Sequence, residues 1–189
     1  MPIDEKKLVE DSRSGDAEAF GSLYDAYVRK IYDYVYYRTH HRETAEDLTA
    51  DVFLKAYRAI GSFDPRKGSF SAWIYRIARN RVIDHSRSKR DSEDIEDVWD
   101  LLRSGDDPAR DAETAERLRQ AERHIAALPA GQREVLLLRA WDGLSYAEIA
   151  ETLGKSEAAC KMSFSRAVSA LRKLAPLAAL LLILANPFL

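Results

Sequence analysis

Leu144–Arg172 is the segment that most restricts the possible folds of this 189-residue chain. Ser145 and Glu148 have the spacing of a capping box, so a helix is predicted to begin immediately after Ser145. Gly154 is a conformationally permissive residue at which that helix can end and the chain can turn. Ser156 is placed to cap a second helix. This order predicts a helix-turn-helix, a motif that places its second helix in the major groove of duplex DNA.

The second helix of this motif has an apolar and a polar face. Its apolar residues recur at steps of three and four and are expected to be buried: Cys160, Phe164, Ala167, Val168 and Leu171. Its polar face carries Lys155, Glu157, Lys161, Ser165, Ser169, Arg172 and Lys173. An ordinary helical hairpin with solvated lysines is the alternative interpretation. The single cysteine excludes an intrachain disulfide, and its place on the apolar face favours packing over a redox or metal role.

The formal net charge of −2 conceals three blocks of opposite sign. Residues 63–90 contain eight Lys or Arg and two Asp or Glu, a net charge of +6. Residues 91–116 have a net charge of −9, and residues 155–173 return to +4. Two basic segments separated by an acidic one favour a nucleic-acid-binding protein. We place a first domain at 1–90, an acidic linker at 91–111, a second domain at 112–174 and an apolar tail at 175–189.

The whole chain is predicted to be all-α, with two small helical domains joined by an acidic flexible linker. In the first domain, helices are expected over 17–37, from Thr44 onward and over 70–87, with a turn-rich loop at 61–69. The residues expected in its core recur at helical spacing: Phe20, Leu23, Tyr24, Tyr27, Val28, Ile31, Val35, Ala45, Leu48, Val52, Ala56, Ile60, Phe70, Trp73, Ile74, Ile77 and Ala78. The residues expected to face outward are Asp47, Asp51, Lys55 and Arg58.

Arg76, Asn80, Asp84 and Arg87 form a polar edge along the helix predicted at 70–87. Basic side chains contact phosphates, and amide or aromatic side chains can hold an unstacked base. The Gly- and Ser-containing loop before this helix could let an extruded base approach the backbone. A solvated basic face would give the same pattern, so both interpretations stay open on these residues alone.

From residue 16 to residue 174 the chain resembles the extracytoplasmic-function (ECF) group of bacterial RNA polymerase sigma factors. The resemblance rests on DAEAFGSLYDAY, AEDLTADVFLKAYRAI, FSAWIYRIARNRVIDHSR and ALPAGQREVLLLRAWDGLSYAEIAETLGKS, in that order. It implies a first domain that binds core RNA polymerase and melts the minus-ten promoter element, and a second domain that recognises the minus-thirty-five element as duplex. It further implies a cytoplasmic, non-enzymatic protein without cofactor or metal, whose partners are core RNA polymerase, promoter DNA and an anti-sigma factor.

Residue roles follow from this resemblance. The polymerase-binding residues are expected to be Asp47, Asp51, Phe53 and Lys55. The minus-ten DNA residues are expected to be Ser62, Arg66, Lys67, Gly68, Ser69, Trp73, Arg76, Asn80 and Arg87, with Asn80 helping to hold the extruded base. The minus-thirty-five residues are expected to be Lys155, Ser156, Glu157, Ala158, Lys161, Ser165, Arg166 and Arg172. Core packing is an alternative role for Phe53 and is favoured for Trp73.

Two other classes of function make different demands on the sequence. A stand-alone helix-turn-helix regulator would bind an operator without polymerase. A DNA-modifying enzyme would need a catalytic constellation, and the sequence offers no convincing metal cluster among His40, His41, His85 and His124.

The apolar tail is shorter than a bilayer span, so burial within the protein or a partner is favoured over membrane contact. The acidic linker is interpreted either as a nucleic-acid mimic or as a solvated tether.

Overall fold

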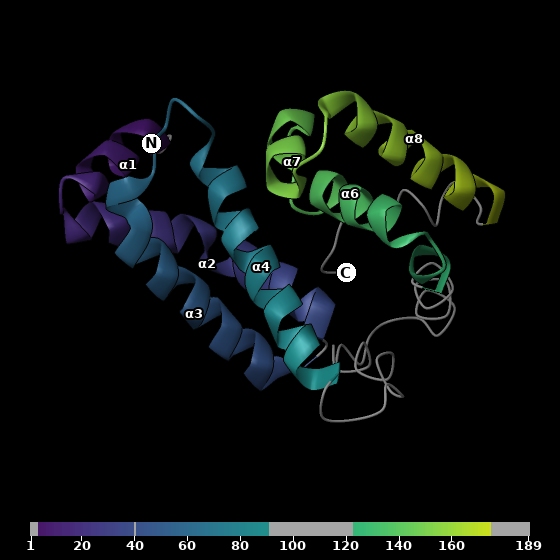
Figure 1. Ribbon diagram of the computed structural model, residues 1–189, viewed down its shortest axis with the longest axis horizontal. Helices are drawn as coiled ribbons and strands as arrows, with labels where there is room; N and C mark the ends of the chain where they lie inside the picture. The colour runs from purple at the N-terminus through teal and green to yellow at the C-terminus, as the bar shows by residue number, and fades with distance from the viewer. Residues whose placement is uncertain (1–3, 40, 91–122, 175–189) are drawn as a thin grey trace, which may run out of the picture. The chain divides into compact units, whose positions relative to one another are not determined.

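The computed structural model describes residues 4–39, 41–90 and 123–174, and these contain helices and no strand (Figure 1). The all-α prediction is therefore confirmed for these ranges. The chain divides into two compact units, Met1–Gly105 and Asp106–Leu189. The predicted linker at 91–111 and the tail at 175–189 lie outside the described residues. Within the described ranges, we found no segment with the length and hydrophobicity that a bilayer crossing requires.

The first unit is a helical bundle in which α2 is the central element. Its helices are α1 (Glu5–Arg13), α2 (Ala17–Thr39), α3 (Arg42–Ala59), the short 3₁₀ helix η1 (Ile60–Ser62) and α4 (Phe70–Arg90). Helix α2 packs against α1, α3 and α4, and α3 also packs against α4. Leu23, Ile31, Val52 and Ile74 are completely buried between these helices, as their spacing predicts.

The helix starts in this unit are fixed by side-chain caps. Asp16 accepts hydrogen bonds from the backbone N–H groups of Glu18 (2.9 Å) and Ala19 (3.2 Å) at the start of α2. Helix α3 begins at Arg42, two residues before the predicted start, because Nδ1 of His41 accepts the N–H of Thr44 at 3.2 Å. Histidine is outside the residue types usually preferred at this position, so its capping role was not predicted.

The sequence prediction was incomplete at the edges of α2 and α4. Tyr24 is 42% exposed, and Val28 and Ile77 are half-buried instead of buried. Helix α2 carries more apolar side chains than one face can cover, so those at the margin of the stripe remain in contact with solvent. Both helices also extend beyond their predicted ends at residues 37 and 87.

Helix α1 was not predicted, although it belongs to the packed core. Val9 is 2% exposed, and the hydroxyl of Tyr27 donates a hydrogen bond to the carboxylate of Glu5. Asp4 caps the helix by accepting the N–H of Lys7 at 3.2 Å. Helix α1 therefore closes one side of α2 and contributes to the support of that helix.

The second unit contains the predicted helix-turn-helix. Its helices are α6 (Ala130–Ala140), α7 (Tyr146–Leu153) and α8 (Glu157–Leu174), and both α6 and α7 pack against α8 (Figure 1). Its core cluster consists of Ile125, Leu128, Leu136, Ala167 and Leu171. Cys160 is completely buried, which confirms its predicted packing role, while Phe164 and Val168 pack against the cluster from partly buried positions.

The turn geometry of this motif was predicted correctly. The Ser145 hydroxyl oxygen accepts the Glu148 N–H at 3.2 Å, and the Glu148 carboxylate accepts the Ser145 N–H at 2.8 Å. Gly154 has φ of +64°, in the left-handed region that favours glycine. The Ser156 hydroxyl oxygen accepts the Ala159 N–H at 3.2 Å and caps α8. These local interactions fix the angle at which α8 leaves the turn.

Candidate nucleic-acid and protein interfaces

The residues predicted to contact duplex DNA all lie on the exposed surface at the start and along the outer face of α8. This set consists of Lys155, Ser156, Glu157, Ala158, Lys161, Ser165, Arg166 and Arg172. Glu157 and Lys161 form an ion pair of 2.6 Å one helical turn apart. The pair offsets one positive charge of the face and limits where the Lys161 ammonium can lie.

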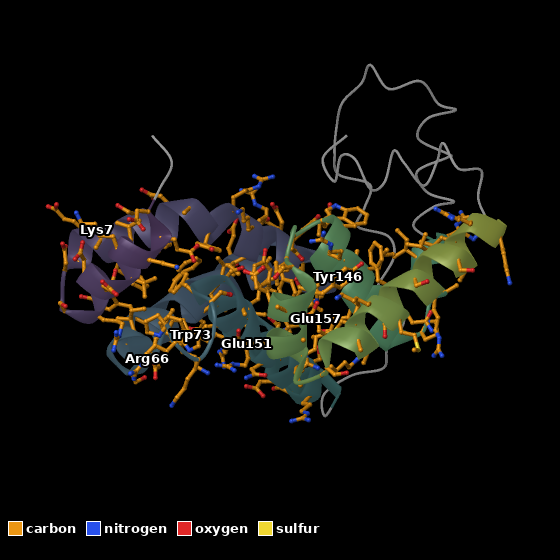
Figure 2. The ribbon with its side chains drawn as sticks, turned by 90° about the horizontal axis from the view of Figure 1, so that it is seen from above. Lys7, Arg66, Trp73, Tyr146, Glu151 and Glu157 are labelled. Carbon is orange, nitrogen blue, oxygen red and sulfur yellow. The ribbon has the colours of Figure 1, made fainter. Side chains whose placement is uncertain are left out.

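Tyr146, the first residue of α7 and labelled in Figure 2, lies close to side chains of α6 and α8. Its ring lies edge-on to Phe164, with centroids 5.9 Å apart. The Arg139 guanidinium and the Lys161 ammonium lie 5.1 Å and 5.8 Å from its centroid, within the range of cation–π attraction. Tyr146 therefore links the apolar core of the second unit to the basic surface of α8.

A shallow groove follows the other side of α8, where this helix meets α6. Its lining residues are Gln132 of α6 and Arg166, Ser169, Ala170 and Lys173 of α8. Arg166 and Lys173 are both exposed and lie two turns apart. This basic groove is open to solvent and suits contact with an extended anion such as a phosphate backbone better than enclosure of a small ligand.

In the first unit, the loop between η1 and α4 is organised by Asp64. Its carboxylate accepts hydrogen bonds from the backbone N–H and the Nε of Arg66, at 3.1 Å and 3.0 Å. The Lys67 ammonium lies 3.9 Å from the same carboxylate. Arg66 and Lys67, both predicted DNA contacts, still have 88% and 84% of their side chains exposed. Arg66 is labelled in Figure 2. The loop therefore presents two cations whose positions are restrained by one acid.

The hydrogen bonds from Arg66 hold the pKa of the Asp64 carboxyl well below its usual range, at about 2. A lowered folded-state pKa means that this interaction is present at neutral pH and is lost as the pH falls through about 2. The restraint on the loop is therefore constant over the physiological range.

The base of this loop rests on an aromatic cluster. The Phe63 and Trp73 rings have centroids 5.0 Å apart, and Phe70 lies 5.7 Å from Trp73. Trp73 is 9% exposed, which confirms the predicted core packing. Ser69 also has a structural role, because its hydroxyl oxygen accepts the N–H of Ala72 at 3.1 Å at the start of α4. Trp73 and Ser69 therefore both have a structural role at the start of α4.

The polar edge of α4 is present as the sequence predicts. Arg76, Asn80, Asp84 and Arg87 are all exposed. Asn80 adds hydrogen-bonding groups to this edge without adding charge. The edge therefore presents two cations, one amide and one carboxylate to solvent.

Helix α3 brings together only part of the predicted polymerase-binding set. Asp47 and Lys55 are exposed, whereas the Asp51 carboxylate accepts a hydrogen bond from Nη2 of Arg81 on α4. Phe53 is 4% exposed and packs edge-on against Tyr24, with ring centroids 4.8 Å apart. Its burial assigns Phe53 to helix packing, the alternative role allowed for it.

Four exposed apolar side chains were not among the predicted contacts. Tyr24, Leu54 and Tyr57 lie on α2 and α3 beside the predicted polymerase-binding residues, with 42%, 46% and 51% exposed. Met162, on α8, is 55% exposed. Leu54, Tyr57 and Met162 could have been found in the sequence, because all three fall off the buried helical stripes. Tyr24 could not, because it lies at the margin of such a stripe.

Two further observations concern metal-ligating and nucleophilic side chains. No group of three His, Cys, Asp or Glu side chains lies close enough there to hold a metal ion. Burial raises the pKa of the Cys160 thiol, which favours the neutral and less nucleophilic form. The exposed predicted contact residues lie on α3, on α4 and its preceding loop, and on α8 and its preceding turn.

Both units of the chain match families of known proteins. Residues 23–92 match the family described as Sigma-70 region 2, and residues 113–171 match Sigma-70, region 4. The chain is 41% identical over 175 residues to the ECF RNA polymerase sigma factor BldN of Streptomyces coelicolor, covering 90% of this chain and 65% of BldN. It is 32% identical over 178 residues to the ECF RNA polymerase sigma factor SigW of Bacillus subtilis, covering 89% of this chain and 95% of SigW.

A solved structure of CnrH in complex with the cytosolic domain of CnrY has a similar fold. The TM-score is 0.67 at 27% sequence identity, and the match covers 90% of this chain and 96% of CnrH. The similarity therefore extends over both units of the chain and over their order in the sequence.

Proposed function

This chain belongs to the sigma-70 family and to its ECF group, and from this premise we propose how its two units divide promoter recognition. The first unit binds core RNA polymerase through α3 and holds the melted minus-ten strand along α4. The second unit recognises the minus-thirty-five element as duplex through α8. Polymerase supplies the chemistry, and the chain supplies the position on DNA.

The observation that carries this proposal is the exposure of the predicted DNA-contacting side chains on two different helices of one chain. In the second unit, these side chains lie at the start and along the outer face of α8. The capping box and Gly154 fix the direction in which α8 leaves the preceding turn. The N-terminal part of such a helix lies nearest the base edges in the major groove. Arg166 and Arg172 lie farther along α8, where contact with phosphates would fix the register of the protein on DNA.

In the first unit, Asn80 is proposed to hydrogen-bond the extruded base, while Arg76 and Arg87 contact the backbone of the melted strand. All three are exposed on α4. Arg66 and Lys67 extend this basic surface from the loop, where Asp64 limits their movement. Binding to a flexible DNA strand is stronger when the protein side chains are already restrained, because the protein then loses less conformational entropy as the contacts form.

Polymerase binding is proposed to involve the exposed Asp47 and Lys55, with Asp51 partly engaged by Arg81. The neighbouring side chains of Tyr24, Leu54 and Tyr57 would supply the apolar part of the interface. A protein interface of this kind combines an apolar centre with a polar rim. The surface on α2 and α3 offers both kinds of side chain.

Regulation by an anti-sigma factor in the cytoplasm is part of the proposal. The structure of CnrH was solved in complex with the cytosolic domain of CnrY, and the structural match to CnrH covers 90% of this chain. A protein partner that covers α3 or α8 would block polymerase or DNA. Membrane contact by the apolar tail, and an active role for the acidic linker, concern residues outside the described ranges.

Transcription in vitro tests the proposal directly. Core RNA polymerase is mixed with the full chain and genomic DNA, and transcript start sites are mapped with and without the chain. We expect chain-dependent start sites that share two sequence elements, one near minus ten and one near minus thirty-five. A chain that binds duplex tightly but neither binds core polymerase nor changes its start sites would instead be a stand-alone regulator.

A further inference from the structure

The outermost line of α8 carries no charged residue over its first three turns. Ala158, Met162, Ser165 and Ser169 follow one another at steps of four, three and four, and all four are exposed. They lie on the side of the helix opposite the buried residues Cys160, Ala167 and Leu171. A duplex that accepts this helix in its major groove therefore meets small, hydroxyl and thioether groups along the centre of the face.

The cations of α8 lie to either side of this line. Lys161 lies on the α7 side, where it forms an ion pair of 2.6 Å with Glu157 and lies near the Tyr146 ring. Glu157 and Tyr146 are labelled in Figure 2. Arg166 and Lys173 lie on the α6 side, where they line the groove with Gln132. Charges on two flanks suit the two phosphate backbones that border a major groove.

Met162 is the most exposed large apolar side chain in the described part of the chain, at 55%. The residues that recognise guanine and adenine by paired hydrogen bonds are Arg, Lys, Asn and Gln, and none of these stands on the central line. The base feature that an apolar side chain recognises in the major groove is the methyl group of thymine. Ala158, one turn before Met162, adds a second apolar contact beside it.

We infer that Met162, assisted by Ala158, is a specificity-determining residue that packs against a thymine methyl group in the upstream promoter element. This inference rests on the proposed recognition of duplex DNA by α8. It concerns which base is preferred, whereas the flanking cations Lys161 and Arg166 set affinity without discriminating among bases.

The test first identifies the preferred duplex and then removes single methyl groups from it. Polymerase holoenzyme assembled with the full chain selects promoters from a library randomised upstream of the minus-ten element. In the selected duplex, each thymine is replaced in turn by deoxyuridine, which lacks only the methyl group. At one thymine we expect about a fourfold loss of affinity, the value for removing one buried methyl-sized group.

Variants assign that methyl group to a side chain. Met162→Ala should bind the thymine duplex about fourfold more weakly and should no longer distinguish it from the deoxyuridine duplex. Met162→Leu, which keeps an apolar side chain, should retain the distinction. Lys161→Ala is the matched control from the same turn, and it should weaken binding to both duplexes by the same factor. Met162 is exposed, so these changes leave the core of the unit intact.

The possible outcomes separate this inference from the proposed function. If the holoenzyme selects an upstream element but Met162→Ala keeps the wild-type preference for thymine over deoxyuridine, the assignment of Met162 is wrong and the proposed function stands. The same conclusion follows if wild type ignores every single methyl group. If no upstream sequence is selected at all, duplex recognition by the second unit is itself contradicted.

Discussion

Helices α4 and α8 both present basic edges, but their predicted DNA contacts differ in how far they are already engaged. Around α4, Arg66 and Lys67 are restrained by Asp64, Ser69 caps the helix, and Trp73 is packed in an aromatic cluster. On α8, the predicted contacts are exposed, and Lys161 pairs with a residue of its own helix. The predicted contacts around α4 are therefore held in place by neighbouring groups, whereas those on α8 lie on an exposed helical face.

This difference matches the two forms of DNA that the helices are proposed to bind. Duplex DNA has a regular groove, so one helix held at a fixed angle is sufficient to place side chains against base edges. A melted strand has no fixed shape, and its extruded base must be held from several sides. The loop and aromatic cluster of the first unit provide such a fixed frame, because Phe63 and Phe70 anchor its two ends.

The largest expected effect tests whether the two surfaces belong to independently folded units. Ile74 and Ile149 are both completely buried, one in each unit. Replacing either by Ala should lower the free energy of unfolding of its own unit by about 3 kcal/mol, because a cavity replaces packed side-chain atoms. Hydrogen exchange followed by mass spectrometry should then show faster exchange in that unit. Equal acceleration in both units by either variant would show that they unfold together.

The second effect separates strand capture from duplex binding. Asn80→Ala should slow open-complex formation about tenfold, because a base would lose hydrogen bonds made only in the melted state. Affinity for the closed promoter duplex should change less than about twofold. The measurement is permanganate reactivity of promoter thymines over time. Asp84→Ala changes another exposed residue of the same edge and serves as the matched control. Equal loss of duplex affinity and opening rate would remove the proposed distinction between α4 and α8.

Local signals in the sequence were sufficient to predict the helix-turn-helix geometry and the buried and exposed faces of α8. The capping box, Gly154 and Ser156 act over at most four residues, so their spacing alone defines the turn and the start of α8. Buried and exposed faces of α8 then follow from helical periodicity. The same periodicity places Met162 outside the buried stripe, although it was not among the predicted contacts.

The surface of the first unit was predicted less completely because its details depend on contacts that have no local signature. The Asp51–Arg81 pair joins residues thirty positions apart on two helices. The exposure of Tyr24 depends on how much of α2 is covered by its neighbours. The polar edge of α4 was still predicted, since it depends on periodicity, but the loop geometry imposed by Asp64 was not.

A smaller effect measures the electrostatic part of duplex binding. Lys161→Ala should lower the affinity of the holoenzyme for duplex promoter about threefold and reduce the slope of log affinity against log salt concentration by about 1. The rate of opening from the bound state should stay the same. Lys7→Ala removes an equal charge from α1, where no contact is proposed, and controls for net charge (Figure 2). A change in opening rate without a change in salt dependence would place Lys161 outside the duplex contact.

The smallest expected effect concerns the Asp51–Arg81 pair, which joins the proposed polymerase-binding helix α3 to the strand-binding helix α4. The side chains are 46% and 25% exposed, so the ion pair is partly screened by solvent. Nε of Arg81 is buried without a hydrogen-bond partner in the described residues.

Breaking the Asp51–Arg81 pair should cost about 0.5 kcal/mol of stability. Arg81→Met would release the Asp51 carboxylate for a basic surface of polymerase, and core affinity without DNA should rise about twofold. Arg76→Met removes the same charge from an exposed position on α4 and is the control. An equal response of both variants would mean that net charge, and not the release of Asp51, governs polymerase binding by this unit.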